Sequence, residues 1–402
     1  MSPAQQRTQK RARVGPLAAA ASKAPLLDVD ALLDDPHTGI IVCCGSGGVG
    51  KTTTSAALAL RAAERGRKVV VLTIDPARRL AQSMGIEELD NTPRPVPDVA
   101  GSGSLDAMML DMKRTFDEVV ESQASPEKAQ QILSNPFYVA LSSSFAGTQE
   151  YMAMEKLGQI HADAQRTGDY DLIVVDTPPS RSALDFLDAP ERLSRFLDGR
   201  FIRLLLAPAK GPAKLMTAGV GMVTNAMTRI LGAQVLRDMQ TFVAAFDTLF
   251  GGFRQRAQKT FELLQADGTA FLVIAAPEPD ALREAAYFVE RLSEDRMPLA
   301  GLVVNRASPP PVGDLSADEA MAAYARAGQQ DGQAATVTAG LLRLHADRSR
   351  LVERETGLRD RFAAAHPRVP TAVVPALAGD VHDLTGLHRI GELLAGQEPS
   401  GS

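Results

Sequence analysis

The chain has 402 residues, of which 23% are charged and 45% are hydrophobic, an ordinary composition for a globular protein. Its net charge of −5 and its lack of tryptophan argue against a nucleic-acid-binding protein, because such proteins carry basic patches and base-stacking aromatic side chains. No apolar run reaches the roughly 18 residues of a membrane-spanning helix, and the amino terminus lacks the apolar core of a signal peptide, so the cytoplasm is the expected compartment.

The amino-terminal segment, residues 1–34, is predicted to be a disordered basic tail. Residues 1–24 carry Arg and Lys side chains but no acidic ones, in a background of Gln, Ser, Pro and Ala. Such a composition does not bury enough apolar surface to fold. A solvated arm and a segment that contacts a membrane or a partner both fit this pattern.

Strand and helix signals alternate from Ile40 onward, which predicts an α/β fold with a mostly parallel sheet flanked by helices. The first helix is expected to end near Ala63, before Gly66. Residues 91–104 form a predicted loop, and residues 308–311 open another that leads into an Ala-, Gln- and Gly-rich segment. The predicted strands cover residues 40–44, 69–74, 105–111, 171–176, 270–275, 300–304 and 371–374.

The alternation stops over residues 190–268, which are helical in pattern. We predict a helical subdomain inserted between two parts of the α/β domain, residues 35–189 and 269–396, with a short tail over residues 397–402. Apolar side chains are dense in the insertion, and four of the 13 methionines lie between residues 216 and 239. These side chains either pack within the subdomain or at a dimer contact, or they line a groove for an apolar partner.

A glycine-rich loop follows the first predicted strand and has the pattern G-x-x-x-x-G-K-T, which is typical of a phosphate-binding P-loop. Its backbone N–H groups are expected to surround the phosphates of a nucleoside triphosphate. Lys51 is predicted to lie along the β- and γ-phosphates, and Thr52 to place its hydroxyl on Mg²⁺. The predicted phosphate-binding residues are Gly45, Ser46, Gly47, Gly48, Val49, Gly50, Lys51, Thr52 and Thr53.

Cys43 and Cys44, the two cysteines of the chain, are adjacent in this first strand. Neighbouring strand residues point to opposite faces, so neither a disulfide nor a joint metal site is expected. The pattern favours two small buried side chains.

Acidic residues follow two further predicted strands. Asp176 ends an apolar strand, the Walker B pattern, and is predicted to support the water shell of Mg²⁺. Asp75 follows the second strand, at the edge of the sheet where α/β proteins bind ligands. It either orients the attacking water or caps the next helix, and its spacing alone leaves both roles open.

These motifs resemble those of the arsenite-pump ATPase family, which includes the ATPases that deliver tail-anchored membrane proteins. The resemblance covers roughly residues 38–396, and the family's P-loop, G-K-G-G-V-G-K-T, differs from this chain at one position. The other matches are switch I at Asp75–Leu80, switch II at Asp176–Ser180 with Leu184, Leu187 and Pro190, a Pro-Glu pair at Pro277–Glu278, V-V-N at Val303–Asn305, and the closing strand at Val374–Pro375.

The resemblance implies a dimeric switch that binds and hydrolyses ATP with Mg²⁺ and couples its nucleotide state to a partner or an apolar client. It implies that Asp75 positions the hydrolytic water, and that Glu278 and Asn305 contact the nucleotide, with Asn305 reading adenine. Pro375 would lie in the loop against the base. In the targeting members, the region matching the insertion forms the groove for a client's transmembrane helix.

Ser46 departs from the family, because it replaces a lysine that reaches across the dimer interface to the partner's phosphates. A homodimer of this chain would lack that cation at both sites. We therefore favour a heterodimer with a paralogue that retains the lysine over a homodimer. Two roles are open for Arg181, Arg78 and Arg79. One of them replaces the missing cation within the same chain, or all three side chains are solvated.

The family's targeting members also share a Zn²⁺ through C-x-x-C pairs, and residues 341–348, the matching region, have none. We therefore expect no zinc site and no cysteine site for arsenite.

Two other functions fit part of the pattern. Partition and septum-positioning ATPases share this type of P-loop, but they usually carry basic DNA-binding residues or end in a membrane-binding helix, and residues 390–402 show neither. A non-catalytic subunit that binds nucleotide is favoured by Ser46 and disfavoured by Asp75.

Overall fold

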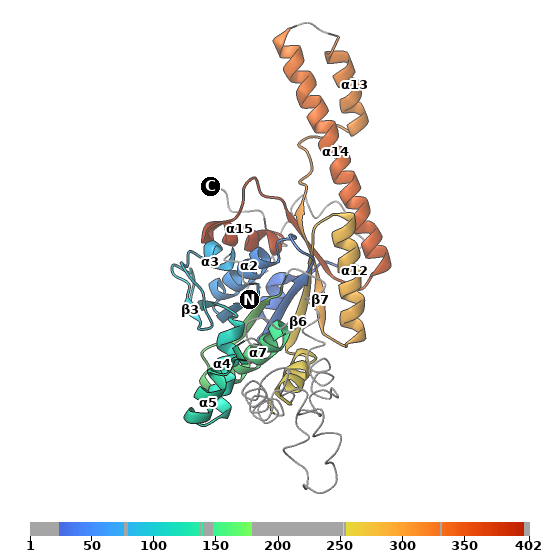
Figure 1. Ribbon diagram of the computed structural model, residues 1–402. Helices are drawn as coiled ribbons and strands as arrows, with labels where there is room; N and C mark the ends of the chain where they lie inside the picture. Colours follow the sequence, from blue (N-terminus) through green and yellow to red (C-terminus); the bar gives the residue numbers. More distant parts are fainter. Residues whose placement is uncertain are drawn as a thin grey trace, which may run out of the picture.

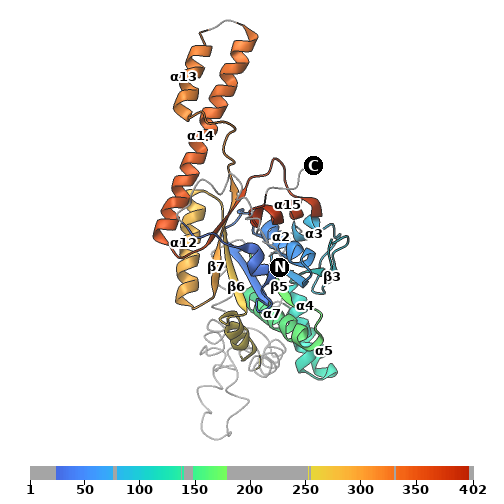
Figure 2. The same ribbon diagram turned by 180° about the vertical axis from the view of Figure 1, so that it is seen from behind.

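The computed structural model describes residues 24–75, 79–136, 138–139, 148–178, 252, 255–329 and 332–397. These residues form one eight-stranded sheet that is covered by helices on both faces (Figures 1 and 2). The strand order is β3-β4-β2-β5-β1-β6-β7-β8, and every neighbouring pair is parallel except β3 and β4. The predicted α/β fold with a mostly parallel sheet is confirmed.

Each of the seven predicted strands is present, and each shares most of its residues with the prediction. The additional strand, β3, has two residues and pairs antiparallel with β4 at the edge of the sheet. Proline has no backbone N–H to donate, and an edge strand tolerates it for that reason. The strands are β1 (Ile40–Gly45), β2 (Lys68–Thr73), β3 (Arg94–Pro95), β4 (Ser104–Met109), β5 (Leu172–Asp176), β6 (Thr269–Ala275), β7 (Leu299–Ala307) and β8 (Thr371–Pro375).

Two apolar cores lie on the two faces of the sheet, and alternate residues of β1 enter each of them. Cys43 is buried in one core and Cys44 in the other, as the strand periodicity predicts. One core lies under α1 (Val29–Asp34), α2 (Lys51–Glu64), α3 (Arg79–Ser83) and α15 (Leu384–Leu394), and the other under α4 (Met112–Gln123), α7 (Thr148–Thr167) and α12 (Pro279–Glu294), with α5 (Pro126–Leu133) at its margin.

The predicted tail over residues 1–34 extends too far along the chain. Residues 29–34 form α1, in which Val29 and Leu33 are buried against the core. The helix is fixed further by an ion pair between Asp30 and Arg61 of α2, with 2.6 Å between Oδ1 and Nε. Apolar side chains at helical spacing outweigh the tail composition, because they bury surface against α2 and β1.

A helical hairpin projects from the sheet domain and gives the molecule an extended arm (Figures 1 and 2). Its helices are α13 (Ala317–Ala327) and α14 (Gln333–Ala365). Much of the Ala-, Gln- and Gly-rich segment is therefore helical, which fits alanine's high helix propensity. At the base of the arm, Phe362 joins the core beneath α12, whereas further out α14 leaves Val337, Leu341 and Leu344 exposed.

No helix in the described part of the chain combines the length and the apolar character needed to cross a membrane. Residues 179–251 lie outside the described residues, and they include most of the predicted inserted subdomain. Residues 255–264 are helical and contact α7, where Arg256 forms an ion pair with Glu155 at 2.8 Å.

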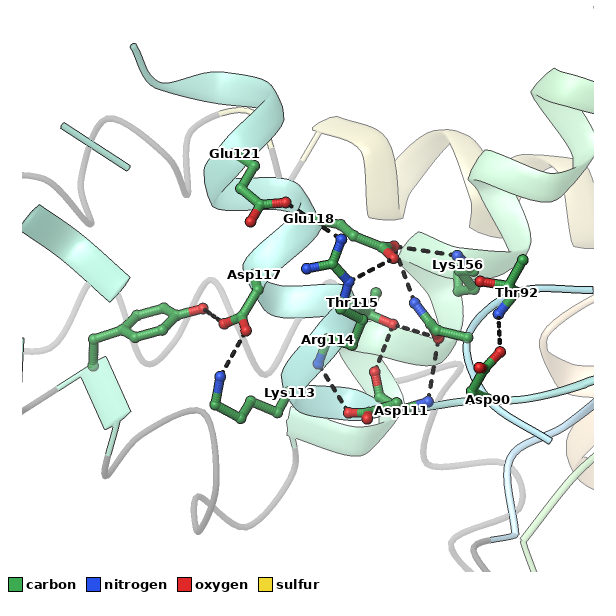
Figure 3. A network of polar contacts seen from close by, with 12 residues as sticks. Asp90, Thr92, Asp111, Lys113, Arg114, Thr115, Asp117, Glu118, Glu121 and Lys156 are labelled. Carbon is green, nitrogen blue, oxygen red and sulfur yellow. Dashed lines mark hydrogen bonds and ion pairs between the residues drawn. The ribbon is translucent and has the colours of Figure 1, made fainter. Parts of the chain in front are cut away.

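A buried asparagine, Asn91, joins α4 to the loop that precedes β3, and the surrounding polar network is shown in Figure 3. Its Nδ2 donates to Glu118 Oε2 at 3.0 Å, and its Oδ1 accepts from Thr115 Oγ1 at 3.1 Å and from the backbone N–H of Asp111 at 3.2 Å. Lys156 of α7 donates to the same Glu118 oxygen at 3.2 Å. The amide group of Asn91 therefore connects its loop with α4, and Glu118 extends the network to α7.

Replacing Asn91 with Ala is expected to lower the free energy of unfolding by about 2–4 kcal/mol, because it leaves several buried polar groups without their partner. The matched change Thr92→Ala, at the exposed neighbouring residue, is expected to alter stability by less than about 0.5 kcal/mol. Urea denaturation followed by circular dichroism measures both. Equal stability of the two variants would contradict the role given to Asn91.

Candidate active site

The carboxyl ends of six adjacent parallel strands meet at one edge of the sheet, and the predicted site residues lie there. The P-loop follows β1, Asp75 follows β2, and Asp176 ends β5. On the other side of β1, Glu278 follows β6, Asn305 lies near the end of β7, and Pro375 ends β8. This is the edge at which open α/β sheets bind ligands.

The P-loop backbone needs glycine at two positions for reasons that the packing makes clear. Gly45 has φ of 151°, and a Cβ atom there would lie 2.1 Å from the carbonyl oxygen of Ile274 in β6. Gly50 has φ of 91°, and a Cβ atom there would lie 2.3 Å from Nδ2 of Asn305. The loop is therefore packed tightly against β6 and β7 before α2 begins at Lys51.

The side chain of Lys51 lies inside this loop, and the residue is only 5% exposed. Its Nζ donates to the carbonyl oxygens of Gly45 at 3.0 Å and Ser46 at 2.8 Å. Burial lowers the pKa of Lys51, and the nearby charge of Asp176 opposes that change. A buried ammonium group surrounded by backbone dipoles at the start of a helix forms a binding position for an anion.

The carboxylate of Asp176 is fully buried between two threonine hydroxyls. Oδ2 accepts hydrogen bonds from Thr52 Oγ1 at 2.8 Å and from Thr73 Oγ1 at 2.9 Å. Burial raises the pKa of Asp176 to about 6, although both hydrogen bonds and the charge of Lys51 act in the opposite direction. The second carboxylate oxygen, Oδ1, has no hydrogen-bond partner within the described residues.

A buried carboxylate oxygen without a partner is costly, and its presence calls for an explanation. The other oxygen of the same carboxylate, Oδ2, binds the hydroxyl of Thr52, and carboxylate and hydroxyl oxygens are hard donors that suit Mg²⁺. The residues present therefore fit a magnesium ion and its water shell. In the described part of the chain, no three His, Cys, Asp or Glu side chains gather in a way that would hold a metal ion by themselves.

Asp75 lies two residues beyond β2 and is half-buried. Its backbone N–H donates to Thr73 Oγ1 at 3.2 Å. Its negative charge opposes the lowering of the Lys51 pKa and adds to the raising of the Asp176 pKa. Asp75 therefore lies in the electrostatic neighbourhood of Lys51 and Asp176. Its role in orienting water or in capping a helix stays a prediction, because residues 76–78 lie outside the described residues.

Asn305 is brought into direct contact with the P-loop, since its Nδ2 donates to the carbonyl oxygen of Val49 at 2.9 Å. Glu278 occupies the N-cap position of α12 and is exposed, without a capping hydrogen bond from its side chain. Pro375 is half-buried and pairs with Ala307 across β7 and β8. Arg79 is exposed at the start of α3, whereas Arg78 and Arg181 lie outside the described residues.

Three site residues are missing from the sequence-based prediction. Thr73 supports Asp176, and Thr177 fixes the end of β5 to β1 through an Oγ1 bond of 2.8 Å to the carbonyl oxygen of Cys43. Arg306 donates to the carbonyl oxygen of Gly48 at 2.9 Å. Each of the three residues lies one or two positions from a predicted site residue at the end of a strand. That position in the sequence is the signal that could have identified them.

The profile of one family, described as anion-transporting ATPase, matches residues 38–333. The chain is similar to ATPase GET3 of Malassezia globosa, at 30% identity over 166 residues, which cover 41% of this chain and 46% of the relative. An ATPase ASNA1 homolog of Cryptosporidium parvum is 27% identical over 262 residues, covering 65% of this chain and 63% of the relative. The match to each of these two relatives thus spans less than two thirds of the relative's length.

A longer match is to ATPase BagA of Mycobacterium tuberculosis. It is 23% identical over 364 residues, which cover 88% of this chain and 91% of the relative.

Substituting Asp176 with Asn is expected to raise the free energy of unfolding at pH 8, without nucleotide or metal, by about 1–3 kcal/mol. The native carboxyl titrates near 6 and the unfolded one near 3.8, so stability present at low pH is lost as the pH rises through about 6. The gain should therefore be smaller at pH 5 than at pH 8.

Urea unfolding with EDTA at the two pH values measures this difference. The matched control is Asp169→Asn, at an exposed site near the amino end of β5, and it should show no such pH-dependent gain. An Asp176→Asn variant less stable than the parent at pH 8 would contradict the electrostatic explanation.

Proposed function

Because the chain belongs to the family of anion-transporting ATPases, we propose that it binds ATP with Mg²⁺ at this edge of the sheet and hydrolyses the γ-phosphate. The observation that carries the proposal is the direct link between the P-loop and the buried acid, the 2.8 Å hydrogen bond from Thr52 to Asp176. It joins the glycine-rich loop to a carboxylate whose second oxygen has no hydrogen-bond partner in the described part of the chain.

In this proposal the P-loop N–H groups and Lys51 bind the β- and γ-phosphates. The positive end of α2 faces the same place, since the helix begins at Lys51. Thr52 and Asp176 would hold the Mg²⁺, which neutralises charge on the phosphate oxygens when bound. Residues 45–53 as a whole would form the phosphate site.

The hydrolytic water is assigned to Asp75. A carboxylate beside the γ-phosphate position accepts a hydrogen bond from water and aligns it for attack. The influence of Asp75 on the pKa values of Lys51 and Asp176 supports this place near the phosphates. Asn305, Glu278 and Pro375 would surround the nucleoside, and Asn305 also donates a hydrogen bond to the loop at Val49.

The proposed working unit is a dimer, with a heterodimer favoured over a homodimer. Ser46 has no charge to send across an interface, so a paralogue with lysine at this position would complete the site of this chain. The proposed client is an apolar or membrane-protein segment bound by the inserted region, residues 190–268, most of which lies outside the described residues. Release of switch contacts on hydrolysis would couple the nucleotide state to that region.

Replacing Lys51 with Ala is expected to abolish measurable binding of Mg-ATP, whereas Asp75→Asn should retain binding and lower turnover by about 100-fold or more. Calorimetry and steady-state phosphate release measure the two effects. The control Asp267→Asn, an exposed residue near the amino end of β6, should leave both unchanged. Full turnover by the Asp75→Asn variant would remove Asp75 from catalysis and favour the helix-capping role.

Introducing the family's lysine by Ser46→Lys is expected to raise the turnover of the chain alone by at least about tenfold, because a cation delivered in trans stabilises the transferring phosphoryl group. The rate should depend on protein concentration, as a dimer requires. Ser46→Gln, a longer side chain without charge, is the matched control. If the parent chain alone already equals the Ser46→Lys variant, the need for a lysine-bearing partner is contradicted.

A further inference from the structure

Two consecutive side chains at the end of β7 bind two consecutive carbonyl groups of the P-loop. Asn305 donates to Val49 at 2.9 Å, and Arg306 donates through a guanidinium nitrogen to Gly48 at 2.9 Å. In a regular strand, neighbouring side chains point to opposite faces of the sheet. The strand must therefore depart from regular geometry to bring both groups to the loop.

The departure is visible in the pairing of β7 with β8. Val304 pairs with Val373 and Ala307 pairs with Pro375, so β7 contains one more residue than β8 between these pairs. Arg306 has φ of 60°, in the left-handed region that side chains other than glycine rarely adopt. Bulges of this kind redirect side chains beside active sites, and backbone strain is concentrated there.

The resulting position of Arg306 is suited to an anion. The residue is exposed, whereas Asn305 and Ala307 on either side of it are buried. The guanidinium group has five N–H donors in a planar array, and the bond to Gly48 uses one nitrogen. Within the described residues, no carboxylate forms an ion pair with Arg306.

The P-loop itself carries little positive charge. Residues 45–53 contain Lys51 as their one cation, with Ser46 at the position where the resembled family has a second. Arg306 adds a permanent positive charge at the surface of the same loop, from a strand 258 residues away in sequence. Arginine binds phosphate oxygens with two parallel hydrogen bonds, which lysine does not provide.

We propose that Arg306 is a nucleotide-binding residue, whose guanidinium group contacts the phosphates of ATP while it rests on the carbonyl of Gly48. It supplies this chain's own phosphates with a second cation beside Lys51, the one cation of residues 45–53. The inference rests on the proposed function, since it concerns the same nucleotide. In this proposal, the bulge and the left-handed backbone of β7 serve to place the charge of Arg306 beside the loop.

The test compares Arg306→Gly with Arg296→Gly. Arg296 is exposed and also left-handed, with φ of 55°, but it precedes β7 and so lies at the opposite edge of the sheet. Both changes remove one positive charge and relieve the same backbone strain. Arg306→Gly also removes the hydrogen bond to Gly48, a loss that Arg306→Gln avoids. Only Arg306→Gly is expected to weaken Mg-ATP binding measured by calorimetry, by about tenfold or more.

Two further variants separate charge from shape. Arg306→Lys should retain much of the affinity, whereas Arg306→Gln, which keeps a donor for Gly48 but no charge, should lose as much as Arg306→Gly. The dependence of affinity on salt should be weaker in both uncharged variants than in the parent. Equal affinity of Arg306→Gly and Arg296→Gly would overturn the inference, and so would full affinity in Arg306→Gln.

Lys51→Ala distinguishes this failure from failure of the proposed function. Should the parent bind Mg-ATP and the Lys51→Ala variant not bind it, the nucleotide site stands and only the assignment of Arg306 is overturned. Should neither bind, or both bind equally, the proposed function itself fails.

Discussion

The carboxylate of Asp176 is the group on which the rest of the site depends. It is fully buried at the end of β5, and the hydrogen bonds from Thr52 and Thr73 to one of its oxygens connect α2 with β2. Burial disfavours its charged form, so the fold carries an electrostatic cost at this position. This electrostatic cost is explained if the charge binds a ligand, because functional sites retain groups that lower the stability of the fold.

The parallel sheet explains why distant parts of the sequence can share this site. With β1 in the interior of the order β2-β5-β1-β6-β7, the loop after β1 lies between acids from one side and amide and guanidinium groups from the other. Parallel strands place all their carboxyl ends at one edge, so residues that follow different strands meet there although crossover connections separate them in the sequence. The arm of α13 and α14 follows the carboxyl end of β7, and Glu355 of α14 accepts hydrogen bonds from Ser308 just beyond that strand (Figure 1).

The sequence predicts those parts of the structure that local patterns encode. The strands, α2, the P-loop and the position of Asp176 follow from apolar periodicity, glycine spacing and the residue that ends each strand. Thr73 was missed because its role requires β2 to lie beside β5, and α1 was missed because its burial depends on partners far along the chain. The bulge near Arg306 depends on the register between β7 and β8, which no local pattern reports.

The carbonyl groups of the P-loop need hydrogen-bond donors, a requirement that the glycine pattern of the loop does not reveal. A loop that turns its N–H groups toward a phosphate must satisfy its carbonyl oxygens from elsewhere. Lys51 donates hydrogen bonds to the carbonyl oxygens of Gly45 and Ser46. Asn305 donates to the carbonyl oxygen of Val49, and Arg306 donates to that of Gly48. A lysine that moves onto a phosphate gives up its carbonyl contacts, so β7 is the element that would keep the loop in shape during that exchange. The irregular end of β7 thus belongs to the proposed nucleotide site together with the loop.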